Sequence, residues 1–326
     1  MDSILRERSL GLGCWALGGD SYGAVSESEA ESLLKKAYEY GVRFFDTSPA
    51  YGDGQSELRI GRYLSNKPDL EIATKVGMLF HEGHQVPYDF SKQALIDSVN
   101  KSLTRLKRDQ IDLLQLHSPV IGFQHEFEDV FETLIFLKES GKVRNVGISL
   151  RSPSYLKQQL DLFDWNSFQF NLSLIDQRIR GVFQEVKIRD CRLIARTPLN
   201  FGFLTENPPN IENLGEKSHL SGWSRKQLEQ WQVNSNKVRE LCLSYGISLL
   251  AASLRFPIDS GLANMVIPGA RNSEELEKNV QAFNNLELPS DITNELIKLY
   301  DSEFNRKVES PYQYVKTSIH AKKLNQ

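Results

Sequence analysis

Short apolar runs alternate with amphipathic segments over most of the chain. The apolar runs predict strands at residues 10–15, 42–47, 71–76, 111–117, 143–149, 167–173, 192–199 and 264–269. Between them, apolar residues recur at helical spacing, as in 26–41, 92–106 and 128–142. Strict alternation of strand and helix indicates a parallel sheet, and the eight predicted strands are the number that closes into a (β/α)8 TIM barrel.

Two segments interrupt this repeat. Residues 200–223, after the seventh predicted strand, are rich in Asn, Pro and Gly and predict a long loop, which inside a compact domain is usually functional. The polar, Lys-rich tail at 304–326 either crosses the mouth of the barrel or is disordered. A chain of 326 residues often forms one α/β barrel, so we expect residues 1–326 to be a single domain.

Composition excludes several functional classes. The net charge of −3 is small, and Lys and Arg are scattered, which argues against a nucleic-acid partner. No apolar stretch approaches the roughly 18 residues of a membrane span. The amino-terminal residues lack the apolar segment of a secretory signal, and the three cysteines show neither disulfide nor zinc spacing. We therefore expect a cytoplasmic protein that has no metal site.

Polar residues lie at the ends of three successive predicted strands. Asp46 lies at the end of the second strand with Tyr51 just beyond it, and Lys75 and His117 lie at the ends of the third and fourth. Because the carboxyl ends of parallel barrel strands share one face, we expect these side chains to converge. Tyrosine has a reference pKa of about 10, and a neighbouring ammonium favours its ionised form. A lysine held by an aspartate would therefore make Tyr51 a usable proton donor.

Each of these residues also has an ordinary structural explanation. Asp46 could cap the turn that follows it, Lys75 could be a solvated strand end, and His117 could be a hydrogen-bonded core histidine. These explanations suit the residues singly. They account less well for all four occurring together at one predicted face of the barrel.

The segments that carry these residues resemble, in order, signature segments of the aldo-keto reductase family: GLGCW, DTSPAYG with SELRIGRYL, ATKVG, IDLLQLH, VGIS, QFN and IPGARNSEELEKN. The resemblance implies a (β/α)8 barrel that binds NAD(P)H without a Rossmann domain and reversibly reduces an aldehyde or ketone. It implies that Tyr51 is the general acid, Lys75 its activator, Asp46 the partner of Lys75, and His117 the residue that orients the carbonyl. Potassium-channel β-subunits resemble the same barrel, so a nicotinamide-binding regulatory or redox-sensing subunit is the alternative.

The resemblance also implies cofactor and substrate contacts. The substrate contacts are Trp15, Tyr51 and His117, and Leu150 replaces an asparagine that is common in the family. Arg196 stands where many relatives place an aromatic ring against the nicotinamide; its planar guanidinium can stack similarly, or it could be a salt-bridged strand end. The implied cofactor residues are Gly13, Cys14, Trp15, Asp46, Ser149, Gln169, Arg196, Pro198, Leu199, Gly202, Leu204, Ile267, Gly269, Ala270, Arg271, Glu275, Lys278 and Asn279.

The helix expected after the eighth predicted strand offers a phosphate site. Backbone N–H groups at its start, from Gly269 to Arg271, and the helix dipole favour an anion. Glu275 would repel the 2′-phosphate of NADP and could accept a hydrogen bond from the free ribose hydroxyl of NAD, whereas Arg271 and Lys278 favour the phosphate. The family's habit favours NADP, and NAD is possible.

Other candidate motifs are weaker. Residues 11–16 match the spacing of a dinucleotide-binding glycine motif, but no apolar helix follows them. His81 and His84 lack the H-E-x-x-H spacing of a zinc site. No pattern of carboxylates or cysteines surrounds the remaining three histidines, and we expect them to lie at the surface: His125, His219 and His320.

Overall fold

The first strand of the chain closes a barrel. The computed structural model describes residues 9–81, 85–119, 127–160, 162–185, 191–215, 218–304, 308 and 313–316. Strands β1 (Ser9–Leu10) and β2 (Leu12–Gly13) are two halves of the first predicted strand. β1 pairs with the last barrel strand, β10 (Met265–Ile267), and β2 pairs with β3 (Phe44–Asp46). The sheet therefore closes on itself, and the predicted (β/α)8 barrel is confirmed.

The other barrel strands pair in parallel between β3 and β10. They are β4 (Glu71–Val76), β6 (Ile111–His117), β7 (Val143–Leu150), β8 (Ser167–Asn171) and β9 (Arg192–Arg196). The prediction extended two of them too far. β9 stops at Arg196 because Thr197 has a φ of 55°, outside the extended region, and β8 stops before the turn in which Ser173 pairs with Asp176.

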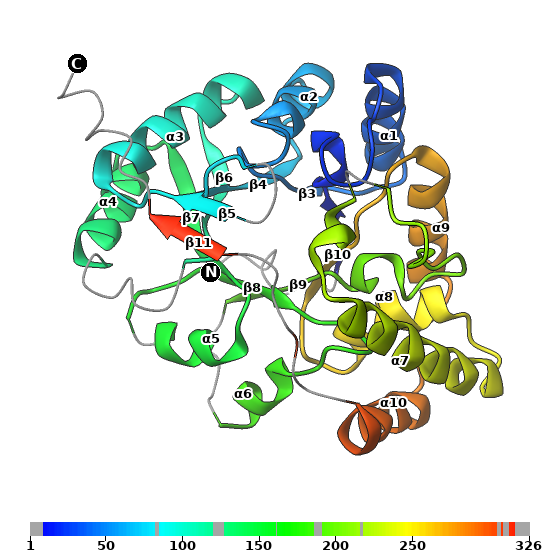
Figure 1. The fold of residues 1–326 in the computed structure, drawn as a ribbon. Helices are drawn as coiled ribbons and strands as arrows, with labels where there is room; N and C mark the ends of the chain where they lie inside the picture. The colour runs from blue at the N-terminus through cyan, green and yellow to red at the C-terminus, as the bar shows by residue number, and fades with distance from the viewer. Residues whose placement is uncertain are drawn as a thin grey trace.

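Helices surround the ring of strands (Figure 1). Their bounds are α1 (Glu27–Glu39), α2 (Gln55–Leu64), α3 (Lys92–Leu106), α4 (Phe127–Glu139), α5 (Pro153–Gln159), α6 (Ile179–Glu185), α7 (Arg225–Ser244), α8 (Leu249–Asp259), α9 (Ser273–Asn284) and α10 (Ser290–Glu303). The three helices expected from apolar spacing are confirmed as α1, α3 and α4. α1 begins at a capping box, in which Ser26 and Glu29 each bond the backbone N–H of the other.

The interior of the barrel changes from apolar to polar along the strands. One buried cluster contains inward residues from five strands: Phe44, Ala73, Leu113, Ile194, Met265 and Ile267. Successive inward positions of a strand are two residues apart. Two residues beyond Phe44, Ala73 and Leu113 lie Asp46, Lys75 and Gln115, all almost fully buried. The apolar layer therefore supports a polar layer at the carboxyl ends of the strands.

Part of the carboxyl-terminal tail returns to this end of the barrel. β11 (Gln313–Lys316) pairs in parallel with β5 (Gln85–Tyr88), which lies between β4 and α3. In Figure 1 the two strands cross in front of β6 and β7. Of the two alternatives for the tail, the structure supports a return to the barrel mouth for residues 313–316; residues 305–307, 309–312 and 317–326 lie outside the described part.

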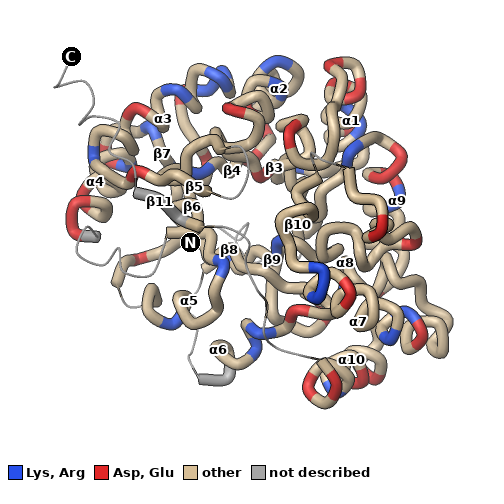
Figure 2. Tube along the Cα trace, in the orientation of Figure 1, with Lys and Arg blue, Asp and Glu red and all other residues tan. Residues whose placement is uncertain are grey.

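The outer helices carry charges of both signs. Figure 2 shows Lys and Arg interspersed with Asp and Glu around the ring of helices. Several of these charges pair along a helix, as Lys35 does with Glu31 and Lys278 with Glu274. In the residues that the structure describes, no single helix is both long and apolar enough to cross a membrane.

Two glycines permit the turn that carries Tyr51 to pack against the loop after β2. Gly52 has a φ of 61°, and a methyl group on it would overlap the carbonyl oxygen of Gly18. A methyl group on Gly18 would in turn meet the Tyr51–Gly52 backbone. Only glycine satisfies both the left-handed backbone and the close approach at residue 52.

We expect Gly52→Ala to destabilise the protein more than Gly141→Ala. Gly141 has a similar φ of 75°, but a methyl group there meets no atom within 4 Å. Gly141→Ala should cost about 1 kcal/mol from backbone strain alone. Gly52→Ala should cost about 2 kcal/mol more, because the methyl group also displaces packed backbone. Urea unfolding of both variants measures the difference, and equal losses would contradict the close approach.

Candidate active site

The ammonium group of Lys75 is the centre of the polar layer. Its side chain is fully buried, on β4, beside the end of β3. Nζ donates to Asp46 Oδ1, to the carbonyl oxygen of Thr47 at 2.9 Å and to Tyr51 Oη at 3.2 Å. An ammonium has three N–H donors, so all of them are used. The predicted convergence of Asp46, Tyr51 and Lys75 is present in the structure.

Two carboxamides hold the second oxygen of Asp46. Gln115 Nε2 and Gln169 Nε2 donate to Asp46 Oδ2 at 3.0 and 2.7 Å. Both glutamines are buried, on β6 and β8. The carboxylate therefore cannot rotate away from Lys75 without breaking these bonds. Gln115 was missed by the sequence analysis, although its position two residues before His117 on one strand places both side chains on the same face.

The pKa values within this network follow from burial and charge together. Burial alone would lower the pKa of the Lys75 ammonium, but Asp46 and Tyr51 offset it and the pKa lies above its usual value. Burial raises the pKa of Tyr51, while Lys75 counteracts the rise. The expected effect of Lys75 is present, but it does not dominate. Tyr51 is therefore protonated at neutral pH, as a proton donor must be.

His117 lies beside Tyr51 at the end of β6. The two rings meet edge to face, with their centroids 5.9 Å apart. Burial lowers the pKa of the imidazole well below its usual value, and the cations of Lys75, Arg196 and Arg151 lower it further. The ring is consequently neutral. Its Nδ1 lies 3.1 Å from the hydroxyl oxygen of Ser48, a buried residue that the sequence analysis did not single out.

Trp15 and the long loop after β9 form a wall beside Tyr51. Trp15 stacks against Tyr51 at 6.1 Å and contacts the ring of His219 at 5.2 Å. His219 Nδ1 donates to the carbonyl oxygen of Ser21 at 3.0 Å. The prediction that His219 lies at the surface is wrong, because its ring is enclosed by aromatic side chains, including Tyr22, and its Nε2 is buried. His125 and His320 lie outside the described residues.

The residues expected to bind the nicotinamide lie next to the network. Ser149, paired in register with both His117 and Gln169, donates to Gln169 Oε1 at 2.8 Å. Arg196 is held at the end of β9 by Asn171 Oδ1 at 2.8 Å and by the carbonyl oxygen of Leu150 at 3.0 Å. Asn171 and Leu150 both offer neutral oxygens to the guanidinium. They hold the plane of the guanidinium at the mouth of the barrel.

The other expected cofactor residues lie at adjoining strand ends. Gly13 pairs with Gly269 in an isolated bridge, and Cys14 is buried with its thiol facing Leu12. Ile267 is the last residue of β10, and Ala270 lies three residues beyond it. Four more lie in the turn after β9, the neighbour of β10: Pro198, Leu199, Gly202 and Leu204.

A carboxylate occupies part of the expected phosphate site at the start of α9. Glu275 accepts from the backbone N–H of Arg271 at 2.8 Å and from its guanidinium at 2.9 and 2.5 Å. Lys278 pairs with Glu274, and Asn279 Nδ2 donates to the carbonyl oxygen of Gly269 at 3.2 Å. Both cations that would attract a 2′-phosphate are therefore paired with neighbouring glutamates.

The residues present fit a nicotinamide dinucleotide. The bridge between Gly13 and Gly269 leaves no side chain at the point where β2 and β10 meet. In the turn after β9, the buried Asn200 Nδ2 has no hydrogen-bond partner within the described part of the chain. An uncommitted buried donor in this position is suited to an acceptor that belongs to a ligand.

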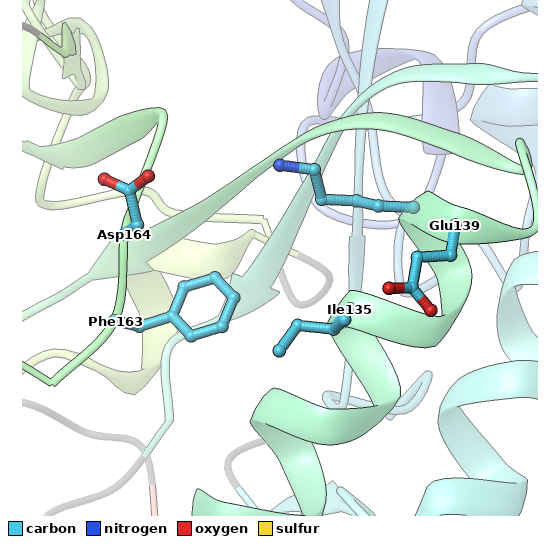
Figure 3. Close-up of a pocket in the computed structure, with 5 residues that line it drawn as sticks. Ile135, Glu139, Phe163 and Asp164 are labelled. Carbon is cyan, nitrogen blue, oxygen red and sulfur yellow. The ribbon is translucent and has the colours of Figure 1, made fainter.

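A pocket on the outer surface is not part of this site. It is lined by Ile135, Lys138, Glu139, Phe163 and Asp164, with Ile135 and Phe163 pointing toward one another (Figure 3). These residues lie in α4 near its carboxyl end and just before β8, so they adjoin the amino ends of strands β7 and β8. The pocket therefore lies at the opposite end of the barrel from Lys75.

Comparison with known proteins identifies similar chains. The model of the Aldo/keto reductase family matches residues 9–301. The uncharacterized oxidoreductase YqkF of Bacillus subtilis is 31% identical over 277 residues, which cover 84% of this chain and 87% of that protein. A D-threo-aldose 1-dehydrogenase of a Pseudomonas species is 27% identical over 320 residues, covering 88% of this chain and 94% of that protein. The holo form of an aldo-keto reductase of Bacillus halodurans has a TM-score of 0.73 at 25% identity, covering 92% and 93% of the two chains.

We expect the burial of His219 to make the unfolding free energy depend on pH. Burial lowers the pKa of His219 to about 4, so below pH 6.5 the unfolded chain takes up a proton that the folded chain excludes. Between pH 7 and pH 5 this should remove about 2 kcal/mol of unfolding free energy. Urea unfolding at both pH values measures this loss. His117 contributes a loss in the wild type and in His219→Phe alike, so the fall in unfolding free energy should be smaller in His219→Phe by the contribution of His219. An identical loss in both would show that His219 is accessible to protons.

Proposed function

The chain belongs to the aldo/keto reductase family, and on that premise we propose that it is a nicotinamide-dependent oxidoreductase that interconverts an aldehyde or ketone and its alcohol. One observation carries the proposal: Lys75 bonds Asp46 and Tyr51 at once, with His117 beside Tyr51. This arrangement provides a proton donor and a second hydrogen-bond donor at one point. A purely structural ion pair needs neither.

Tyr51 is oriented to give its proton away. Its oxygen accepts from Lys75, so its own hydrogen is free to bond a carbonyl oxygen. The cofactor would supply a hydride to the carbonyl carbon. As the proton leaves Tyr51, the adjacent ammonium stabilises the forming tyrosinate. In alcohol oxidation the same tyrosinate, formed beside Lys75, is the base.

His117 orients the carbonyl. A neutral imidazole carries one N–H, which donates to the carbonyl oxygen as negative charge builds on it. Lys75, Arg196 and Arg151 oppose a second proton on the ring, so His117 remains a donor and does not replace Tyr51 as the acid. The stacked ring of Trp15 forms an apolar wall for a small substrate.

Charge at the start of α9 bears on the choice of cofactor. Family habit favours NADP, but a 2′-phosphate must displace the Glu275 carboxylate from both the backbone N–H and the guanidinium of Arg271. NAD places no such charge there. The pairing of Arg271 with Glu275 therefore favours NAD, the alternative that the sequence left open, and Ser149, Gln169 and Arg196 would hold the nicotinamide end of either dinucleotide.

The decisive experiment replaces the proposed acid. Tyr51→Phe should lower kcat for a panel of aldehydes by at least about 10²-fold, because it removes the transferred proton. Binding of NADH or NADPH, measured by quenching of tryptophan fluorescence, should be unchanged. Tyr63→Phe is the matched control, since the Tyr63 hydroxyl bonds Glu27 outside the site. Cofactor binding by the wild type without turnover of any carbonyl would favour the regulatory or redox-sensing alternative.

Cofactor preference should shift when the carboxylate at residue 275 is neutralised. At low ionic strength, Glu275→Gln should raise the ratio of kcat/KM for NADPH to that for NADH about tenfold, because Arg271 becomes available to the phosphate. Glu274→Gln removes a carboxylate from the same helical turn, but one that pairs with Lys278. Its ratio should change less. A ratio unaffected by Glu275→Gln would show that Glu275 swings away without cost when NADPH binds.

A further inference from the structure

The buried hydroxyl of Ser48 contacts one edge of the His117 ring. Ser48 lies in the turn after β3, its side chain is fully buried, and its oxygen is 3.1 Å from His117 Nδ1. The same oxygen accepts from the backbone N–H of Ala50 at 3.1 Å. These are the bonds that Ser48 makes within the described part of the chain.

The surroundings of Ser48 decide which way its hydrogen bond to His117 runs. If His117 Nδ1 were the donor, the Ser48 hydrogen would be buried with no acceptor among the described residues. Leaving a buried donor unpaired costs about 1–3 kcal/mol. If Ser48 donates to Nδ1 instead, its oxygen still accepts from Ala50, and every group is satisfied. The second arrangement leaves Nδ1 without a hydrogen.

A neutral ring with no hydrogen on Nδ1 carries its hydrogen on Nε2. His117 is not fully enclosed, with 4% of its surface exposed. Nε2 has no hydrogen-bond partner in the part of the chain that the structure describes, and it is not one of the fully buried polar atoms that lack a partner. It is therefore the ring nitrogen that is available to a ligand.

We propose that Ser48 is a positioning residue that holds His117 in the tautomer with its hydrogen on Nε2, facing the substrate carbonyl. The assignment of the tautomer rests on the contacts of Ser48 alone. Only the step that gives Nε2–H a carbonyl partner rests on the proposed function. A carbonyl oxygen can only accept, so the opposite tautomer would present a lone pair to it and repel it.

The charged groups around His117 set whether the ring is protonated, and Ser48 sets where its one hydrogen lies. Lys75 on β4, Arg196 on β9, Arg151 after β7 and His81 in the loop after β4 all oppose an imidazolium. None of them bonds Nδ1. The ring is neutral because of burial and these cations, and neutrality alone does not choose between the two nitrogens.

Long-range ¹⁵N–¹H correlation NMR on the full chain labelled with ¹⁵N-histidine tests the tautomer directly. His117→Gln identifies the His117 signals by their loss. In the wild type, Nδ1 should give the signal of an unprotonated nitrogen and Nε2 that of a protonated one. In Ser48→Ala, the Nδ1 signal should move toward that of a tautomer mixture. The pKa of His117 should also rise, because its neutral form loses a hydrogen bond.

Two control variants separate tautomer choice from general packing. Ser48→Thr retains the hydroxyl and should retain the wild-type His117 signals. Ser56→Ala removes another fully buried hydroxyl, which bonds the Cys14 carbonyl oxygen at 2.9 Å, and should leave His117 unchanged. Ser48→Ala, but not Ser56→Ala, should lower kcat about five- to tenfold and shift the acid limb of the pH profile of kcat to higher pH.

Two results would overturn the proposal: a hydrogen on Nδ1 of wild-type His117, or His117 signals that are the same in Ser48→Ala as in the wild type. Neither measurement needs turnover. A wild type with the Nε2–H tautomer but no activity on any carbonyl would contradict the proposed function and leave the role of Ser48 in selecting the tautomer intact.

Discussion

A fully buried ammonium is the constraint on which the mouth of the barrel depends. Removing Lys75 from water costs several kcal/mol unless an opposite charge and further hydrogen bonds replace the solvent. Asp46 provides the charge, and Gln115 and Gln169 then satisfy the second oxygen of that carboxylate. Ser149 extends the network by bonding Gln169. Five strands are thus tied together by one polar requirement. Within the residues that the structure describes, Gln115 Oε1 is a buried acceptor of this network that has no hydrogen-bond partner.

The geometry of the strands explains why this network forms at one level. Inward positions repeat every two residues, so an apolar layer lies directly beneath the polar one on each of β3, β4 and β6. The apolar layer excludes water from below, and the helices exclude it from outside. The polar groups therefore have each other, nearby backbone groups such as the Thr47 carbonyl and a ligand as partners in place of bulk water, which is the condition under which electrostatic effects are strong.

The same burial explains the protonation states. It keeps Tyr51 protonated and His117 neutral, while Lys75 remains charged because Asp46 is held beside it. An acid, a neutral donor and a fixed cation are thereby available together at neutral pH. The sequence indicated that Lys75 would favour the ionised form of Tyr51, and this effect is present, but desolvation outweighs it. The size of the desolvation depends on packing and not on the identity of a neighbour.

The sequence by itself determined the eight barrel strands, their alternation with helices and the position of Asp46, Tyr51, Lys75 and His117, because periodicity and strand ends are local properties. It did not determine the other partners of those groups, beyond the contacts of Lys75 with Asp46 and Tyr51. Gln115 and Gln169 bond Asp46 across 69 and 123 residues, and Ser48 bonds His117 across 69. The closing of the barrel creates these contacts. Only the tertiary structure decided them, because a side chain's hydrogen-bond partner depends on which distant groups are buried with it.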